Sequence, residues 1–244
     1  LQEAWNDALK FKQDALAAFR LGYMGLRDRA TAEQLTWACA DAIVSQLPND
    51  QAVPDELAAL NKALAGTYYA NLSIFRSAPD TWAIDQLFPV LPIQKLNQQP
   101  TRLANLADLT CDSDGRLDRF IGEGQPKPLL ELHELSNDEP YLIGLFLGGA
   151  YQEVMGNLHN LFGSTNAVHI RLSPGGSYRI DHVVRGDTNA DVLEAMEHEP
   201  RALLERLRMA TETAINNNQL RIDESRRLLD HLESSLRQTT YLQD

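Results

Sequence analysis

The stretch AVHIRLSPGGSYRIDHVV, from Ala167 to Val184, decides the fold class of the middle of this chain. Two runs rich in β-branched and aromatic residues flank the sequence SPGGS. Such runs are typical of strands, and glycine supplies the positive φ angles that a tight turn between two strands requires. The stretch therefore predicts a β-hairpin.

The sequence between Gly66 and this hairpin has a similar pattern of short runs. Short apolar runs separated by proline and glycine read TYYANLSIF, QLFPVLPI, LADLTCD, PLLELHEL and YLIGLFLGG. Several short strands at this spacing are typical of a sandwich or a partly closed barrel rather than of a parallel sheet. We therefore expect a mainly antiparallel β-domain.

A helical pattern precedes the β-region. From Trp5, apolar residues recur at every third or fourth position, as in a helix with one buried stripe. A second helix is expected to begin at Thr31, because Thr31 and Gln34 have the spacing of a capping box, and to stop at Pro48. A third helix is expected to start near Pro54.

Two further boundaries complete the predicted organisation. Gly66 suits a left-handed cap at the end of the third helix, and helical spacing returns after Asp187 with a break at Pro200. The chain is therefore predicted to have an α+β fold with three parts. These are a helical bundle insertion at 1–66, a β-sandwich or barrel domain at 67–186, and a C-terminal helical domain at 187–244.

Composition disfavours several functional classes. The 244 residues are 43% hydrophobic, which suffices for a substantial core, and the formal net charge of −12 disfavours nucleic acid or an anionic membrane as a partner. No run of about 18 apolar residues is present, so we expect a soluble chain. Because it begins at Leu1 rather than methionine, we expect it to be a piece of something longer or a processed chain.

The two cysteines, Cys39 and Cys111, form no CxxC pair and no disulfide framework. This is compatible with a reducing compartment, and we expect a cytoplasmic protein. Cys39 lies on the apolar stripe of a predicted helix and is expected to be a small buried hydrophobe. Cys111 has a different setting, because acidic residues follow it directly in LADLTCDSDGRLD.

A calcium loop is the first interpretation of that stretch, and it fails. If Asp112 is position one of an EF-hand loop, Asp114 and Glu123 fall at positions three and twelve, as required. However, Arg116 then occupies position five, where it cannot bind calcium, and Leu117 occupies position six, where the sharp turn needs glycine. The stretch is therefore not an EF-hand.

Two other interpretations remain open from the residues alone. A nucleophilic Cys111 would need a base to form its thiolate, and the adjoining carboxylates disfavour that form. His133, His159 or His169 could serve from a distance. The alternative is an ordinary strand that ends in a turn, where Asp and Gly supply the turn chemistry.

The stretch LGGAYQEVMGNLHNLFG, from Leu147 to Gly163, is the second candidate region. Two glycines after an apolar run allow another backbone or a ligand to approach, and Tyr151 then presents a hydroxyl that could donate to a phosphate. Neither GxGxxG nor GxxxxGK[ST] is present, so this is no phosphate loop. The structural alternative is a buried strand with a glycine bulge and an aromatic plug.

Three ordered blocks together resemble a known family. They are YYANLSIFRSAPDTWAIDQLFPVLP from Tyr68, LTCDSDGRLD from Leu109 and LFLGGAYQEVMGNLHNLFG from Leu145, and the closing TYLQD extends the likeness. They resemble the carboxy-terminal part of the biosynthetic arginine decarboxylases, pyridoxal-phosphate enzymes with an alanine racemase-like fold. The resemblance implies decarboxylation of L-arginine to agmatine, in polyamine (spermidine) biosynthesis.

The resemblance also implies roles for single residues. Cys111 matches the cysteine that helps to deliver a proton after carbon dioxide leaves, and Asp112 matches an acid that binds the cationic end of the substrate. Asp114 adds a second carboxylate, which a broad guanidinium group calls for. Tyr151 matches the tyrosine that bonds the cofactor phosphate, and His159 matches an aromatic contact to the substrate.

The resemblance also implies that this chain lacks the part of the enzyme that binds the cofactor covalently. In this family a (β/α)₈ barrel holds pyridoxal phosphate on a lysine, and the β-domain of one subunit completes the barrel site of another. None of the five lysines here, Lys10, Lys12, Lys62, Lys95 and Lys127, matches that context. We therefore expect the chain to be inactive without an amino-terminal barrel portion as partner, within a homodimer or larger homo-oligomer.

Three points stay open at this stage. The family is often described as using magnesium, but no residue here is identified as its ligand. A non-catalytic homologue that regulates a true decarboxylase is one alternative function. A decarboxylase of ornithine, lysine or diaminopimelate is another.

Overall fold

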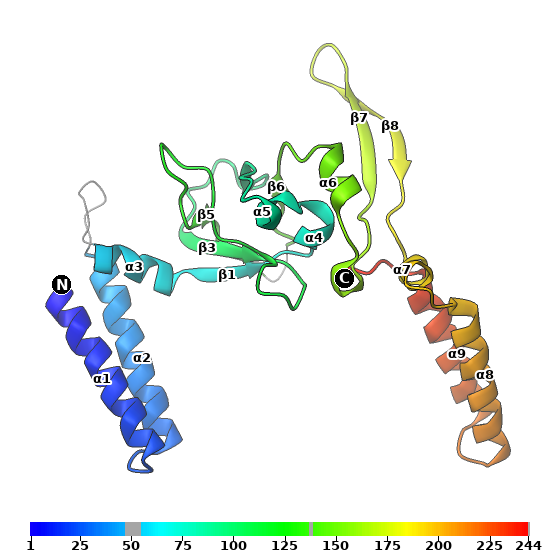
Figure 1. Cartoon of the computed structure of the whole chain (residues 1–244), viewed down its shortest axis with the longest axis horizontal. Coiled ribbons are helices and arrows are strands. Elements are labelled where there is room, and N and C mark those ends of the chain that lie inside the picture. The colour runs from blue at the N-terminus through cyan, green and yellow to red at the C-terminus, as the bar shows by residue number, and fades with distance from the viewer. Residues whose placement is uncertain (47–54, 137–138, 244) are drawn as a thin grey trace. The chain divides into compact units, whose positions relative to one another are not determined.

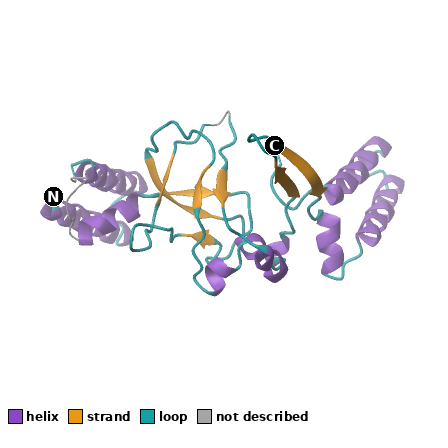
Figure 2. Cartoon of the chain, turned by 90° about the horizontal axis from the view of Figure 1, so that it is seen from above, coloured by secondary structure: helices purple, strands orange, loops and turns teal. Residues whose placement is uncertain are grey.

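The structure is a computed structural model that describes residues 1–46, 55–136 and 139–243. Helices make up the beginning and the end of this described chain, and strands with short helices occupy the middle (Figure 2). The helices of the first part are α1 (Gln2–Arg20), α2 (Leu26–Val44) and α3 (Asp55–Leu64). Pro48 and Pro54, the expected helix boundaries, lie outside the described residues.

Helices α1 and α2 run side by side in opposite directions, and α3 packs on α2 (Figure 1). Their apolar stripes meet in a core of Trp5, Ala40, Ile43 and Leu60, with Cys39 partly buried against it. The expected start of the second helix at Thr31 is wrong. Gly25 is the N-cap, and the Thr31 hydroxyl donates to the Arg27 carbonyl at 3.1 Å within the helix.

The middle of the chain contains short strands in three sheets. The strands are β1 (Gly66–Tyr69), β2 (Val90–Pro92), β3 (Arg102–Ala107), β4 (Arg116–Leu117), β5 (Leu130–Leu132), β6 (Ile143–Leu145), β7 (Ala167–Leu172) and β8 (Tyr178–Val184). One sheet has the order β1-β3-β4 with β5 also paired to β3, and β2-β6 and β7-β8 form pairs. The pairs β3-β4, β3-β5 and β7-β8 are antiparallel, as expected, and no sheet of the described strands closes into a barrel.

Gly66 is not a left-handed helix cap, because its φ is not positive and it opens β1. TYYANLSIF was expected to be one strand, yet β1 ends at Tyr69 and helix α4 (Ile74–Ser77) follows. Ser73 causes the change, since its hydroxyl accepts a hydrogen bond from Arg76 N and caps α4. Helix α5 (Asp80–Ala83) comes next.

The hairpin predicted from SPGGS is present as β7 and β8. Gly175 and Gly176 have φ angles of 92° and 83° in its turn. The register pairs Val168 with Val183, Ile170 with Ile180 and Leu172 with Tyr178, so these six apolar side chains share one face, which we call the apolar hairpin face. All six are at least 45% exposed, and Leu172 is 80% exposed.

Three helices end the chain: α7 (Asn189–Ala195), α8 (Pro200–Asn216) and α9 (Ile222–Arg237). The expected break at Pro200 is correct, because Pro200 is the first residue of α8. A capping box between Thr188 and Asp191 starts α7. Helices α8 and α9 pack side by side, and α7 contacts both (Figure 1).

The chain divides into two compact units, and segments of the two units alternate along the sequence. Unit 1 comprises 1–68, 90–105 and 118–144, and unit 2 comprises 69–89, 106–117 and 145–244. The α+β class, with a helical bundle, antiparallel strands and C-terminal helices, is confirmed. Within the described residues no helix has both the length and the hydropathy needed to cross a membrane.

Candidate functional site

All five predicted site residues belong to unit 2, and three of them lie on one loop. This loop follows β3 and is closed by Asp108, which is 2% exposed. One carboxylate oxygen of Asp108 accepts the Ile74 N–H at 2.8 Å, and the other accepts the N–H and hydroxyl of Thr110 at 2.8 and 2.6 Å. A buried carboxylate with three donors fixes the start of the loop to the first turn of α4.

Gly115 closes the other end of the loop. Its carbonyl accepts the Asp108 N–H at 2.7 Å, and a Cβ at Gly115 would lie only 2.3 Å from Asp108 Oδ1. Between these ends, Asp112 makes an Asx turn in which its Oδ1 accepts the Asp114 N–H at 2.9 Å. The turn leaves the Cys111 and Asp114 side chains exposed, with Asp112 half-buried.

A second segment contacts this loop. It contains helix α6 (Ala150–Met155) and the 3₁₀ turn η1 (His159–Leu161). His159 Nε2 lies 3.3 Å from Asp112 Oδ2, and Asn160 Oδ1 accepts the Cys111 N–H at 3.0 Å. The His159 ring also stacks on Phe75 of α4, with ring centroids 4.2 Å apart. The structure thus places His159 beside Asp112, and its neighbour Asn160 beside Cys111.

Tyr151 lies on helix α6 and is exposed. It is the second residue of α6 rather than the end of a strand, and its side chain is 79% exposed. The aromatic plug is therefore wrong. Nothing lies within 4 Å of a Cβ built at the preceding Gly149, so the backbone before Tyr151 faces open space.

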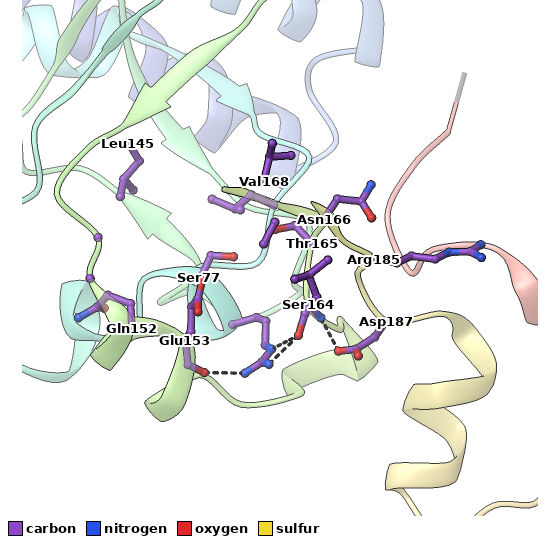
Figure 3. A pocket seen from close by; sticks show the side chains of 16 residues that line it. Ser77, Leu145, Gln152, Glu153, Ser164, Thr165, Asn166, Val168, Arg185 and Asp187 are labelled. Atoms are coloured by element: carbon purple, nitrogen blue, oxygen red, sulfur yellow. Dashed lines mark hydrogen bonds between the residues drawn. The ribbon is translucent and has the colours of Figure 1, made fainter. Parts of the chain in front are cut away.

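A cavity of about 620 Å³ lies beside α6, and its lining includes Arg76, Gly148, Gly149, Glu153, Ser164 and Arg185. Figure 3 shows a guanidinium group, which belongs to Arg76, with hydrogen bonds to Ser164 and Glu153. Arg76 donates to Ser164 Oγ at 2.6 Å and to the carbonyls of Glu153 and Gly156 at 3.0 Å each. It therefore fixes the end of α6 instead of presenting a free cation.

Sequence reasoning missed three residues that build the site. These are Arg76, Asp108 and Asn160, and each acts through a contact between segments far apart in the sequence. Only Asp108 left a signal, because an Asp side chain often accepts the backbone N–H two residues further on and so forms a turn. Across residues 1–46, 55–136 and 139–243, no group of three or more His, Cys, Asp and Glu side chains could hold a metal ion.

Comparison with known proteins finds family matches at both helical ends of the chain. A family described as the arginine decarboxylase helical bundle domain matches residues 1–61, and one described as the arginine decarboxylase C-terminal helical extension matches residues 190–242. The sequence is 89% identical over all 244 residues to the biosynthetic arginine decarboxylase of Parasynechococcus marenigrum. It is 72% identical over 243 residues to that of Prochlorococcus marinus strain MIT 9303.

The chain spans 38% of the length of each of these two relatives. A solved structure gives the same picture. The crystal structure of the biosynthetic arginine decarboxylase from Campylobacter jejuni matches 98% of this chain and 36% of its own, with 30% sequence identity and a TM-score of 0.79. In sequence and in fold, this chain therefore corresponds to the carboxy-terminal portion of the biosynthetic arginine decarboxylases.

Proposed function

We propose that this chain supplies the carboxy-terminal part of a pyridoxal-phosphate-dependent arginine decarboxylase, which converts L-arginine to agmatine and carbon dioxide in polyamine biosynthesis. The observation that carries the proposal is the 89% identity, over the whole chain, to an enzyme of that name. The site geometry supports it, because one short loop presents a thiol and two carboxylates.

The two carboxylates suit the substrate's distal cation. A guanidinium group is planar and has five N–H donors, so it is bound best by several acceptor oxygens. Asp114 is exposed, and Asp112 is held by His159 at 3.3 Å. We assign substrate recognition to Asp112 and Asp114, with His159 orienting Asp112 and contacting the substrate beside it.

The thiol of Cys111 suits proton donation, and the phenol of Tyr151 suits binding of the cofactor phosphate. Cys111 is exposed, and we assign its thiol to donate a proton to the substrate carbon after carbon dioxide leaves. Tyr151 offers an exposed hydroxyl as a donor to the cofactor phosphate. Pyridoxal phosphate, when bound, supplies an electron sink for the electron pair left by decarboxylation.

The residues of unit 2 fit recognition of this cofactor but not its covalent attachment. All five lysines lie in unit 1, whereas every candidate site residue lies in unit 2. The attaching lysine is therefore assigned to the amino-terminal barrel portion of the enzyme, within a homodimer or larger homo-oligomer. The magnesium ion that the family resemblance implies is assigned no ligand in this chain.

Exposed apolar surface supports the proposed partner. Leu147, Tyr151, Val154 and Met155 around α6 are 58% to 84% exposed, and the apolar hairpin face is uncovered as well. Surfaces of this kind mark sites of protein association. We assign the amino-terminal portion as the part that covers them, because the relatives are more than twice as long as this chain.

The test is reconstitution with the remaining amino-terminal portion of the Parasynechococcus enzyme. Carbon dioxide release should be absent from either part alone and present in the mixture with arginine, but not with ornithine, lysine or diaminopimelate. Activity with another amino acid would correct the substrate. A chain that only modulates a complete decarboxylase would favour the regulatory alternative.

Substitutions then test the assigned roles in the reconstituted enzyme. Cys111→Ala should lower kcat by about a hundredfold or divert protonation, since a positioned proton donor contributes that much. Cys39→Ala is the matched control, because Cys39 packs on the helical core. Asp114→Ala should raise KM for arginine far more than it weakens cofactor binding. Unchanged kinetics and product for Cys111→Ala would remove that residue from the mechanism.

A further inference from the structure

The η1 turn holds the cysteine loop through two consecutive residues. His159 contacts Asp112 at 3.3 Å, and Asn160 accepts the Cys111 N–H at 3.0 Å. Neighbouring residues on one segment therefore meet neighbouring residues on the other. The Asn160 contact holds the backbone of Cys111 directly, and the His159 contact holds the side chain of the next residue, Asp112.

The backbone of η1 is unusual where it makes this contact. Asn160 and Leu161 have φ angles of 53° and 64°, in the left-handed region. Residues with a side chain rarely adopt this conformation, and asparagine tolerates it better than most. Glycine would satisfy the backbone equally well but offers no acceptor. Asparagine combines the left-handed backbone with the oxygen that Cys111 N–H needs.

We propose that Asn160 is a positioning residue for Cys111, acting through the Cys111 backbone N–H. The proposal rests on the proton-donor role proposed for Cys111. A proton donor must lie within hydrogen-bond reach of the atom that it protonates, so a loop displaced by a fraction of an ångström loses rate while its thiol stays intact. Residues other than glycine that have a left-handed backbone conformation are often found at functional sites.

Three variants separate positioning from folding. Asn160→Gly keeps the left-handed backbone and removes the acceptor, whereas Asn160→Asp keeps an acceptor oxygen. Asn218→Gly is the matched control, because Asn218 has a φ of 56° and lies exposed between α8 and α9. It makes the same chemical change in the same backbone conformation, in the helical tail rather than in the cysteine loop.

The first measurement needs no enzyme activity. Amide hydrogen exchange at Cys111 in the 244-residue chain reports directly on the hydrogen bond to Asn160. We expect exchange about tenfold faster in Asn160→Gly, which matches the net worth of one hydrogen bond. Asn160→Asp and Asn218→Gly should exchange at the wild-type rate. Equal exchange in wild type and Asn160→Gly would overturn the proposal.

The second measurement uses the enzyme reconstituted with the amino-terminal portion. Asn160→Gly should lower kcat on the order of tenfold with KM within about twofold, because Asp112 keeps its contact with His159. Asn160→Asp should recover most of the kcat. If both Asn160 variants lose activity only in proportion to their loss of folded protein, the role of Asn160 is purely structural. That result would overturn the proposal. An inactive wild-type mixture would sink the proposed function instead and leave the exchange result standing.

Discussion

Tyr241 shows how one residue joins the end of the chain to the segment after η1. Its hydroxyl donates to the Gly163 carbonyl at 2.8 Å, and its ring stacks on Phe162 with centroids 5.3 Å apart. Burial is the main reason that the pKa of Tyr241 is raised to about 12. Ionisation of this phenol therefore opposes the folded state.

The expected pH dependence has a definite sign. The unfolded phenol has a pKa of about 10, below the folded value, so its contribution to stability is present below pH 10 and is lost as pH rises toward 12. Tyr241→Phe should remove this loss of stability at alkaline pH. It should also lower the unfolding free energy by about 1 to 3 kcal/mol near pH 8, because the Gly163 carbonyl loses its donor.

Urea unfolding at pH 8 and pH 11 measures both effects. Tyr23→Phe is the matched control, since Tyr23 is 85% exposed. The same pH slope in wild type and Tyr241→Phe would contradict the assignment.

The sequence predicted some residues of the candidate site but not others. Cys111, Asp112 and Asp114 were predicted to act together because their stretch resembles the matching stretch of the biosynthetic arginine decarboxylases. Asn160 was not foreseen, because its role depends on a left-handed backbone and a partner 49 residues away. The burial of Asp108 likewise arises only when α4 packs against the loop. The roles of all these residues stay predictions until they are measured.

At the scale of elements, Asp108 couples the cysteine loop to helix α4. Asp108→Asn keeps the size of the side chain but replaces one of two accepting oxygens with a donor group. At least one of the N–H groups of Ile74 and Thr110 then lacks a partner. We expect the unfolding free energy to fall by about 1 to 3 kcal/mol.

The midpoint of urea unfolding checks this expectation. Asp14→Asn, which changes an exposed carboxylate on α1, should leave the midpoint near that of the wild type. An unchanged midpoint for Asp108→Asn would show that the loop and α4 are held by other contacts.

Elements were predictable where one local rule dominates. The β7-β8 hairpin follows from β-branched runs around two glycines, and α8 begins at a proline. Helices α4 and α6 were missed because each is less than two turns long and interrupts an apolar run that favours strands. The start of α2 was misplaced because Thr31 bonds back to its own helix instead of capping it.

For the whole molecule, the apolar hairpin face gives the sharpest expectation. A two-stranded hairpin with an uncovered apolar face is marginal in water. Ile170→Glu should weaken association with the amino-terminal portion at least about tenfold, since burying such a side chain is worth roughly 1.5 to 3 kcal/mol. His169→Glu places the same charge on the opposite face of β7 and is the control.

Sedimentation of the mixed parts would measure this association. Equal affinities for the two variants would show that the apolar hairpin face is not covered by the amino-terminal portion.

The placement of the lysines in unit 1 has a practical consequence for spectroscopy. An aldehyde such as pyridoxal phosphate condenses with primary amines, and all five lysine side chains of this chain lie in unit 1. Any coloured adduct formed with the chain alone therefore arises in the unit that lacks the cysteine loop. Absorbance of that kind reports incidental labelling, and only an adduct that requires the amino-terminal portion can report an assembled site.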